Sequence, residues 1–257
     1  MNWLQHAETW LAILSLILTG LLLVRIWTQG LHLVYRYFSL YLLVDLIRSG
    51  LGLALPTRSD AYTIFYFVST PLMWIVYLLV LIEMFELVLR DHPGVATAAR
   101  WVMASALLIA GAISFVSSSI DFANQNEKYV LLRSFLAGHR IVLSTLALAL
   151  LLLCAFLAWF PVILRRNIFL YCLGFSVTFL AQASLVLLRN LLGNPIWPSA
   201  LILGISCLCL SVWIWKLNHE GEERQLAVGH RWNREEADRL MRQLDEINST
   251  LVRVARR

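Results

Sequence analysis

The chain has 257 residues, of which 60% are hydrophobic and only 14% are charged, and its formal net charge is +5. Soluble domains carry roughly a quarter charged residues, so this composition excludes an ordinary soluble globular protein and indicates one that exposes apolar surface to lipid. Residues 218–257 hold 8 arginines and 8 acidic residues, whereas residues 1–217 hold 13 basic and 8 acidic ones, so the net charge belongs to the hydrophobic part. No run of Lys or Arg forms a separate basic arm, so we expect contact with anionic lipid head groups and no nucleic-acid partner.

Apolar stretches long enough to cross about 30 Å of hydrocarbon recur along the first 217 residues. They are continuously apolar rather than alternating, which favours helices over strands. The predicted spans lie at about 9–27, 37–56, 62–89, 100–119, 139–161, 167–190 and 197–217. The sequence therefore predicts an all-α fold: a polytopic bundle of seven transmembrane helices over residues 1–217, followed by a linker and an amphipathic helix over residues 218–257.

The distribution of charge predicts the orientation. The leader before the first span, Met1 to Trp10, has no Lys or Arg, and no small-residue cleavage site precedes Arg25, so we expect an uncleaved anchor with its amino terminus translocated. In that orientation the inner loops carry six arginines and the outer loops three basic residues, and the charged tail lies in the cytoplasm. A multi-pass protein with its amino terminus outside and its carboxyl terminus cytoplasmic is the prediction.

Charged residues inside the second and third spans are candidates for a ligand or relay site. Asp45 and Arg48 lie roughly 13 and 18 Å from the inner surface at 1.5 Å per residue, and Glu83 about 10 Å deep. Because the second and third helices are antiparallel neighbours, these three side chains are expected to form one buried polar cluster. Trp74, beside the helix-kinking Pro71, is a candidate cavity wall. The alternatives are a self-neutralised pair that fixes one helix against the other, and an aromatic packed in a core.

Several familiar sites are absent from the sequence. The four cysteines fall inside apolar segments without metal-ligand or disulfide spacing, and the six histidines offer no facing pair for haem. The sequence has no His-Glu-x-x-His, no phosphate-binding Gly-Lys-Ser/Thr loop and no Gly-x-Ser-x-Gly elbow. We therefore expect no metal, no cofactor and no enzymatic activity.

The carboxyl-terminal tail has the pattern of a helix that pairs. Apolar residues recur at spacings of three and four, which is a heptad seam. The seam begins at Ala237, and its candidate oligomerisation residues are Leu240, Leu244, Ile247, Leu251 and Val254. Acidic residues lie at its start and arginines at its end, in agreement with the helix dipole. The helix is expected either to pair with a second copy or a protein partner, or to lie flat on the inner leaflet.

A weak internal repeat relates the two halves of the bundle. Aligning residues 36–56 with 166–186 matches Arg36/Arg166, Leu40/Leu170, Tyr41/Tyr171, Leu43/Leu173 and Leu55/Leu185. If helices 1–3 and 5–7 are parallel repeats joined by the fourth, the arrangement is that of SWEET-type sugar transporters. The paired inner prolines of those transporters are not evident, so the analogy concerns architecture alone.

Arg36-x-Phe38-x-x-Tyr41 leads into the second span, Arg48-Ser49 follows within it, and aromatic residues crowd the start of the third span at Tyr62, Phe65, Tyr66 and Phe67. Over residues 1–217 this pattern resembles uncharacterised seven-helix proteins of bacterial genomes. That resemblance implies a bacterial inner membrane and no particular activity.

Three hypotheses for function follow. The first is a receptor-like or regulatory module that signals or assembles through its cytoplasmic helix, the second a small-solute transporter with its site near Asp45, and the third a structural subunit of a membrane complex. We favour the first, because the tail has the most specific physical design.

Overall fold

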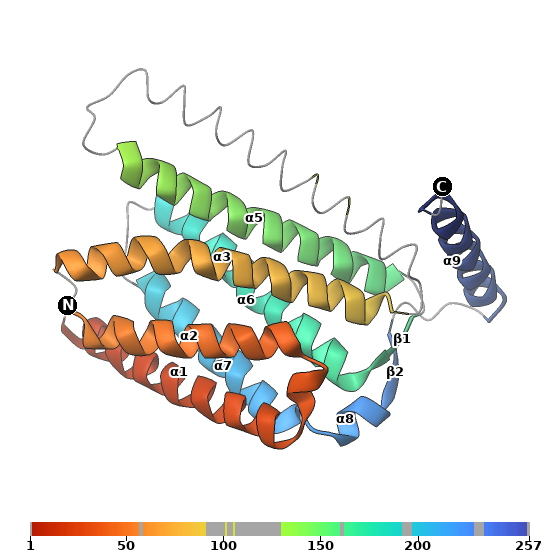
Figure 1. Ribbon diagram of the computed structural model, residues 1–257, viewed down its shortest axis with the longest axis horizontal. Coiled ribbons are helices and arrows are strands. Elements are labelled where there is room, and N and C mark those ends of the chain that lie inside the picture. Colours follow the sequence, from red (N-terminus) through yellow and green to blue (C-terminus); the bar gives the residue numbers. More distant parts are fainter. Residues whose placement is uncertain are drawn as a thin grey trace. The chain divides into compact units, whose positions relative to one another are not determined.

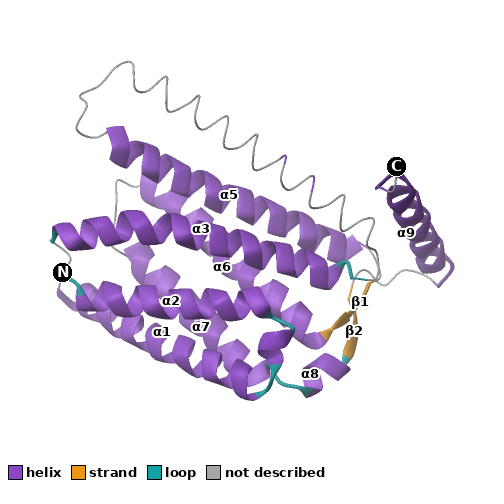
Figure 2. Cartoon of the chain, viewed as in Figure 1, coloured by secondary structure: helices purple, strands orange, loops and turns teal. Residues whose placement is uncertain are grey.

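The computed structural model describes residues 2–56, 59–90, 101, 105, 130–159, 162–191, 197–228 and 234–255. Helices account for most of them (Figures 1 and 2). The long helices are α1 (Asn2–Thr28), α2 (Arg36–Ala54), α3 (Asp60–Val88), α5 (Val130–Trp159), α6 (Arg166–Leu191), α7 (Trp197–Lys216) and α9 (Arg234–Ala255). The short elements are the 3₁₀ helix η1 (Leu31–Leu33), α8 (Glu220–Glu223), and the strands β1 (Val162–Arg165) and β2 (Gln225–Val228).

Six of the described helices are long and apolar enough to cross a membrane: α1, α2, α3, α5, α6 and α7. They correspond to six of the predicted spans, so a multi-pass helical membrane protein is confirmed in outline. The predicted fourth span, residues 100–119, lies outside the described residues except for Trp101 and Ser105.

The chain divides into two compact units, residues 1–84 with 163–226, and residues 85–162 with 227–257. In the first unit α1 packs against both α7 and α2, while α6 packs against α7. Figure 1 shows these helices running alongside one another, with α8 and the strands gathered at one end. The second unit contains α5 and α9.

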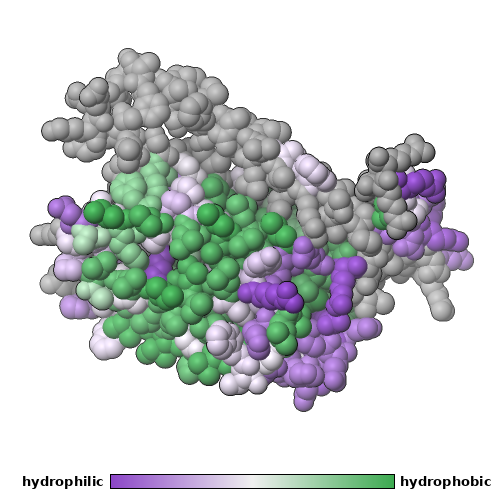
Figure 3. Space-filling view, in the orientation of Figure 1, coloured by the Kyte–Doolittle hydropathy of each residue, from purple (hydrophilic) through white to green (hydrophobic). Residues whose placement is uncertain are grey.

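The exposed side chains on the outer faces of the first unit are largely apolar, as contact with lipid requires. Exposed leucines, isoleucines and valines line α1, α2, α3 and α7, and Figure 3 shows the hydrophobic surface on the face of the molecule formed by α1, α2 and α3. Helices satisfy their own backbone hydrogen bonds, which lipid cannot do for them. Side-chain hydroxyls in these helices also find a hydrogen-bond partner within their own helix. Each donates to the backbone carbonyl four residues earlier, at 2.7–2.8 Å, in Ser176, Thr178 and Ser211.

Aromatic rings fill the space between α2, α6 and α7. The Phe38 ring lies 4.9 Å from that of Tyr171 and 5.1 Å from that of Trp213, centroid to centroid. The Trp213 indole donates to the Leu170 carbonyl at 3.0 Å. It passes so close to Gly174 that a Cβ there would collide with the ring. A glycine therefore sets how closely α6 and α7 approach.

The segment that the sequence assigns to a linker begins with defined structure. Residues 218–228 form α8 and β2, and β2 pairs with β1 in a two-stranded sheet (Figure 2). The sequence does not predict these strands. The pairing gives backbone groups of both segments hydrogen-bond partners where the chain leaves its long helices.

Candidate functional site

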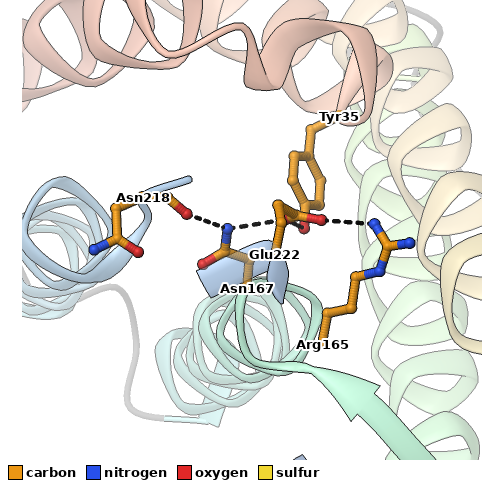
Figure 4. Close-up of polar contacts among 5 residues, drawn as sticks. All are labelled: Tyr35, Arg165, Asn167, Asn218 and Glu222. Atoms are coloured by element: carbon orange, nitrogen blue, oxygen red, sulfur yellow. Dashed lines mark hydrogen bonds and ion pairs between the residues drawn. The ribbon is translucent and has the colours of Figure 1, made fainter. Parts of the chain in front are cut away.

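A single carboxylate, that of Glu222 in α8, gathers the ends of three other parts of the chain (Figure 4). Its Oε1 accepts hydrogen bonds from the Tyr35 hydroxyl and, at 2.8 Å, from the Asn167 amide. Its Oε2 pairs with the Arg165 guanidinium at 3.0 Å. Tyr35 immediately precedes α2, Arg165 ends β1 and Asn167 lies in the first turn of α6. We call these four residues the Glu222 clamp.

The clamp is partly shielded from water on the Glu222 side. The side chain of Glu222 is 11% exposed and that of Arg165 is 42% exposed. Solvent therefore screens the ion pair mainly on the arginine side. Burial, and then the Glu222 carboxylate, raise the pKa of Tyr35 far above its usual range. Tyr35 therefore remains a protonated hydrogen-bond donor at physiological pH.

Asn167 and Gly221 fit against each other beneath the clamp. Asn167 is fully buried, and its amide also donates to the Asn218 carbonyl at 2.8 Å. Its carbonyl oxygen has no hydrogen-bond partner among the described residues and lies against the Cα of Gly221, where any Cβ would overlap it. The Asn218 side chain accepts from the Gly221 amide at 2.9 Å, which starts the α8 turn.

A second buried carboxylate, that of Glu83 on α3, caps the start of α2. It accepts from the backbone amides of Tyr37 and Phe38 at 2.8 and 3.0 Å, and from the Tyr171 hydroxyl at 2.9 Å. The residue preceding α2 gives the helix no side-chain cap of its own. Glu83 is 5% exposed, so its charge is compensated by these donors and by the positive end of the helix dipole.

Two tyrosines join the clamp to the cap. The Tyr35 and Tyr171 rings meet edge to face at 5.5 Å, and both are buried. Tyr35 bonds Glu222 and Tyr171 bonds Glu83. The first turn of α2 is therefore held from two sides, by a carboxylate from α3 and by one from α8.

The structure separates the predicted polar cluster into two places. On α2, Glu83 accepts hydrogen bonds from residues 37 and 38, about 11 Å along the helix from Asp45. Asp45 and Arg48 stay together, half-buried on α2, and interact electrostatically. Both also interact electrostatically with Tyr77 of α3, in opposite senses, and the Tyr77 hydroxyl interacts with Gln182 of α6. Sequence reasoning did not identify Tyr77 as a partner of the pair.

Trp74 is half-buried on α3, one turn before Tyr77. Its placement on that helix is compatible with either alternative, a cavity wall or a packed core.

The predicted seam of the tail falls on α9. Leu240 is half-buried, whereas the side chains of Leu244, Ile247, Leu251 and Val254 lie outside the described residues. The pairing of α9 stays a prediction.

The clamp residues were not among the sequence-based candidates. Glu222 sits in the polar stretch Glu220-Gly221-Glu222-Glu223, which is typical of a solvated linker. The available signals are an isolated glycine in that stretch and polar residues at the starts of two spans, Tyr35 and Asn167. Within the described part, no three His, Cys, Asp or Glu residues come together as a metal site requires, and the four cysteines are free thiols.

Comparisons with models of protein families, with curated proteins and with solved structures found no match.

Proposed function

We propose that this chain is a receptor-like or regulatory module of a bacterial inner membrane, with its amino terminus outside and α9 in the cytoplasm. The observation that carries the proposal is the Glu222 clamp. Glu222 belongs to the segment that leads from the last span towards α9, and its partners belong to the starts of α2 and α6 and the end of β1. A rearrangement of those helices therefore acts directly on the segment that carries α9.

The clamp suits signalling because its geometry is exacting. Hydrogen bonds weaken steeply with a change of less than an ångström in length or with poor alignment. Three donors from separate elements converge on one carboxylate, so a small shift of α2 relative to α6 breaks at least one bond. A merely structural tether needs no such convergence.

The output of the proposed module is assembly through α9. Three heptads are marginal as a free coiled coil in water, but attachment to a membrane raises the effective concentration of the helices. Acidic residues Glu235 and Glu236 in the first turn and Arg253 in the last support a stable helix.

Assembly is tested by changing the seam of α9. The double variant Leu244→Glu/Leu251→Glu, and deletion of residues 233–257, should reduce the oligomer mass in detergent, measured by light scattering. Gln243→Glu/Ser249→Glu adds the same charge at exposed positions of α9 and should leave the mass unchanged. An unchanged mass in the seam variant and in the deletion removes the assembly part of the proposal.

Regulation is tested separately from assembly. In a background with the four cysteines replaced by alanine, Leu244→Cys reports the approach of two copies through disulfide formation. Tyr35→Phe, which removes one clamp bond, should change the rate of that reaction at least severalfold in membranes. An identical rate would favour a structural subunit, whose assembly does not depend on the state of the bundle.

The alternative function, a small-solute transporter, is favoured by one observation. Asp45, Arg48, Tyr77 and Gln182 bring polar groups from α2, α3 and α6 together inside a membrane-spanning bundle, and such groups mark substrate pathways in many transporters. Uptake of labelled sugars and amino acids into proteoliposomes, compared between the native chain, Asp45→Asn and Arg48→Gln, tests it. Uptake indifferent to both changes excludes that site.

A further inference from the structure

The inner ends of α1 and α7 carry two cations that the clamp does not use. Arg25 lies in the last turn of α1 and Lys216 ends α7. The two helices pack against each other, and the Arg25 Nε donates to the carbonyl of Leu217, the residue after Lys216, at 3.3 Å. The two side chains therefore lie at the same level of neighbouring helices.

Neither cation has an acidic partner in the part of the chain that the structure describes. The ion pair of Glu222 is with Arg165, and no other carboxylate there comes within 4.0 Å of Arg25 or Lys216. Each helix end contributes about half a negative charge, so two cations leave a net charge of about +1. The guanidinium uses one nitrogen for Leu217, and its two terminal nitrogens remain for an anion.

Below each cation the helix surface is exposed and aliphatic. Residues four and eight positions earlier lie on the same face of a helix as the residue itself. On α1 these are Leu21 and Ile17, 55% and 53% exposed; on α7 they are Val212 and Leu208, 44% and 67% exposed. Each helix thus carries a cationic side chain at its end and, next to it, two exposed aliphatic side chains, which we call its aliphatic stripe.

An exposed indole marks the water boundary at this level. Trp215 is 74% exposed, and the Lys216 ammonium lies 4.1 Å from the centre of its ring. Tryptophan concentrates at the head-group level of membranes, and the cation–π contact holds the ammonium there.

We propose that the inner ends of α1 and α7 form a binding site for the phosphate head group of an acidic phospholipid. Arg25 and Lys216 bind the phosphate, and the acyl chains lie along the exposed aliphatic stripes. Inorganic phosphate would bind the two cations but would leave the aliphatic side chains uncovered, so the surface fits an amphiphile better than a soluble anion. This site is independent of the proposed regulatory function.

Lipid binding to the full chain in detergent micelles tests the site, with native mass spectrometry as the readout. The probes are dioleoyl-phosphatidylglycerol, dioleoyl-phosphatidylcholine and inorganic phosphate. At about fivefold per cation near a membrane surface, Arg25→Gln/Lys216→Gln should weaken phosphatidylglycerol binding roughly 25-fold. Lys216→Gln alone, which leaves the Arg25 bond to Leu217 intact, should weaken it about fivefold.

The matched control is Arg36→Gln/Arg224→Gln, which removes the same charge from two exposed arginines. Binding in this control should stay within about twofold of the native chain. An equal loss in the control, native binding in both test variants, equal binding of phosphatidylcholine, or full competition by inorganic phosphate would each overturn the proposal.

Discussion

At the residue scale, the carboxylate of Glu222 accepts bonds from a tyrosine, an asparagine and an arginine that lie on different elements. Charged acceptors make these bonds stronger than neutral ones, at about 1.5–3 kcal/mol each. The arginine contributes least, because its half-exposed side chain keeps its hydration. Tyr35 and Asn167, both buried, contribute most.

Tyr35→Phe should therefore lower the free energy of unfolding by about 1.5–3 kcal/mol, since it removes one charge-assisted bond and little volume. The midpoint of thermal unfolding in detergent should fall by roughly 3–10 °C. Glu222→Gln should cost at least as much, because the new amide meets the same three donors with one acceptor oxygen.

Glu223→Gln provides the control for both variants. Glu223 is the next residue and is exposed, so its change should alter stability by less than about 0.5 kcal/mol. If Glu222→Gln unfolds at the same temperature as Glu223→Gln, the clamp does not hold α8.

At the element scale, the approach of α6 and α7 depends on Gly174. The Trp213 indole lies over this residue and donates to the carbonyl one turn earlier. Gly174→Ala should displace the indole, break its bond to Leu170 and destabilise the helix pair by about 1–3 kcal/mol. Tryptophan fluorescence and thermal unfolding measure the two effects.

Gly204 offers a matched control within α7, because a Cβ built there meets nothing within 4 Å. Gly204→Ala should be neutral or stabilising, since alanine is the better helix former by about 1 kcal/mol in water. Equal effects of the two alanines would mean that the contact between α6 and α7 does not require a glycine.

At the scale of the whole molecule, the charge distribution predicts which end faces which compartment. A fluorescent protein fused after Arg257 should fluoresce, and alkaline phosphatase fused there should be inactive, because the loop charges predict a cytoplasmic carboxyl terminus. Phosphatase fused after Arg58, in the first outer loop, should be active. The reverse pattern would contradict the predicted orientation, and with it the predicted leaflet of the proposed lipid site.

The membrane helices were predictable because the lipid requirement acts on local composition. The stretch predicted at 37–56 is the helix Arg36–Ala54, and that predicted at 197–217 is Trp197–Lys216. A continuous apolar run predicts the type of the element and the part that crosses lipid, but not how far the helix continues beyond it: α1 and α5 begin seven and nine residues before the predicted spans. The predicted span at 100–119 is not tested by the described residues.

The polar contacts were harder to predict because they depend on which helix ends meet in three dimensions. The depth of Glu83 along its helix predicted that it lies near α2. Two of its three hydrogen bonds, however, come from backbone amides, which almost every residue offers and which no sequence pattern distinguishes. Glu222 looks in sequence like its exposed neighbours Glu220 and Glu223. Only the fold distinguishes the glutamate that faces Tyr35 from those that face water.

The close fit of Gly221 on Asn167 has an evolutionary consequence. A side chain at 221 is compatible with this packing only if the amide at 167 has been replaced by something smaller. In related sequences the two positions should therefore covary, glycine accompanying asparagine and a larger residue at 221 accompanying a small one at 167. Such a paired change would preserve the packing of α8 against the start of α6 even in related sequences that have other residues at position 222 and at the positions of its partners.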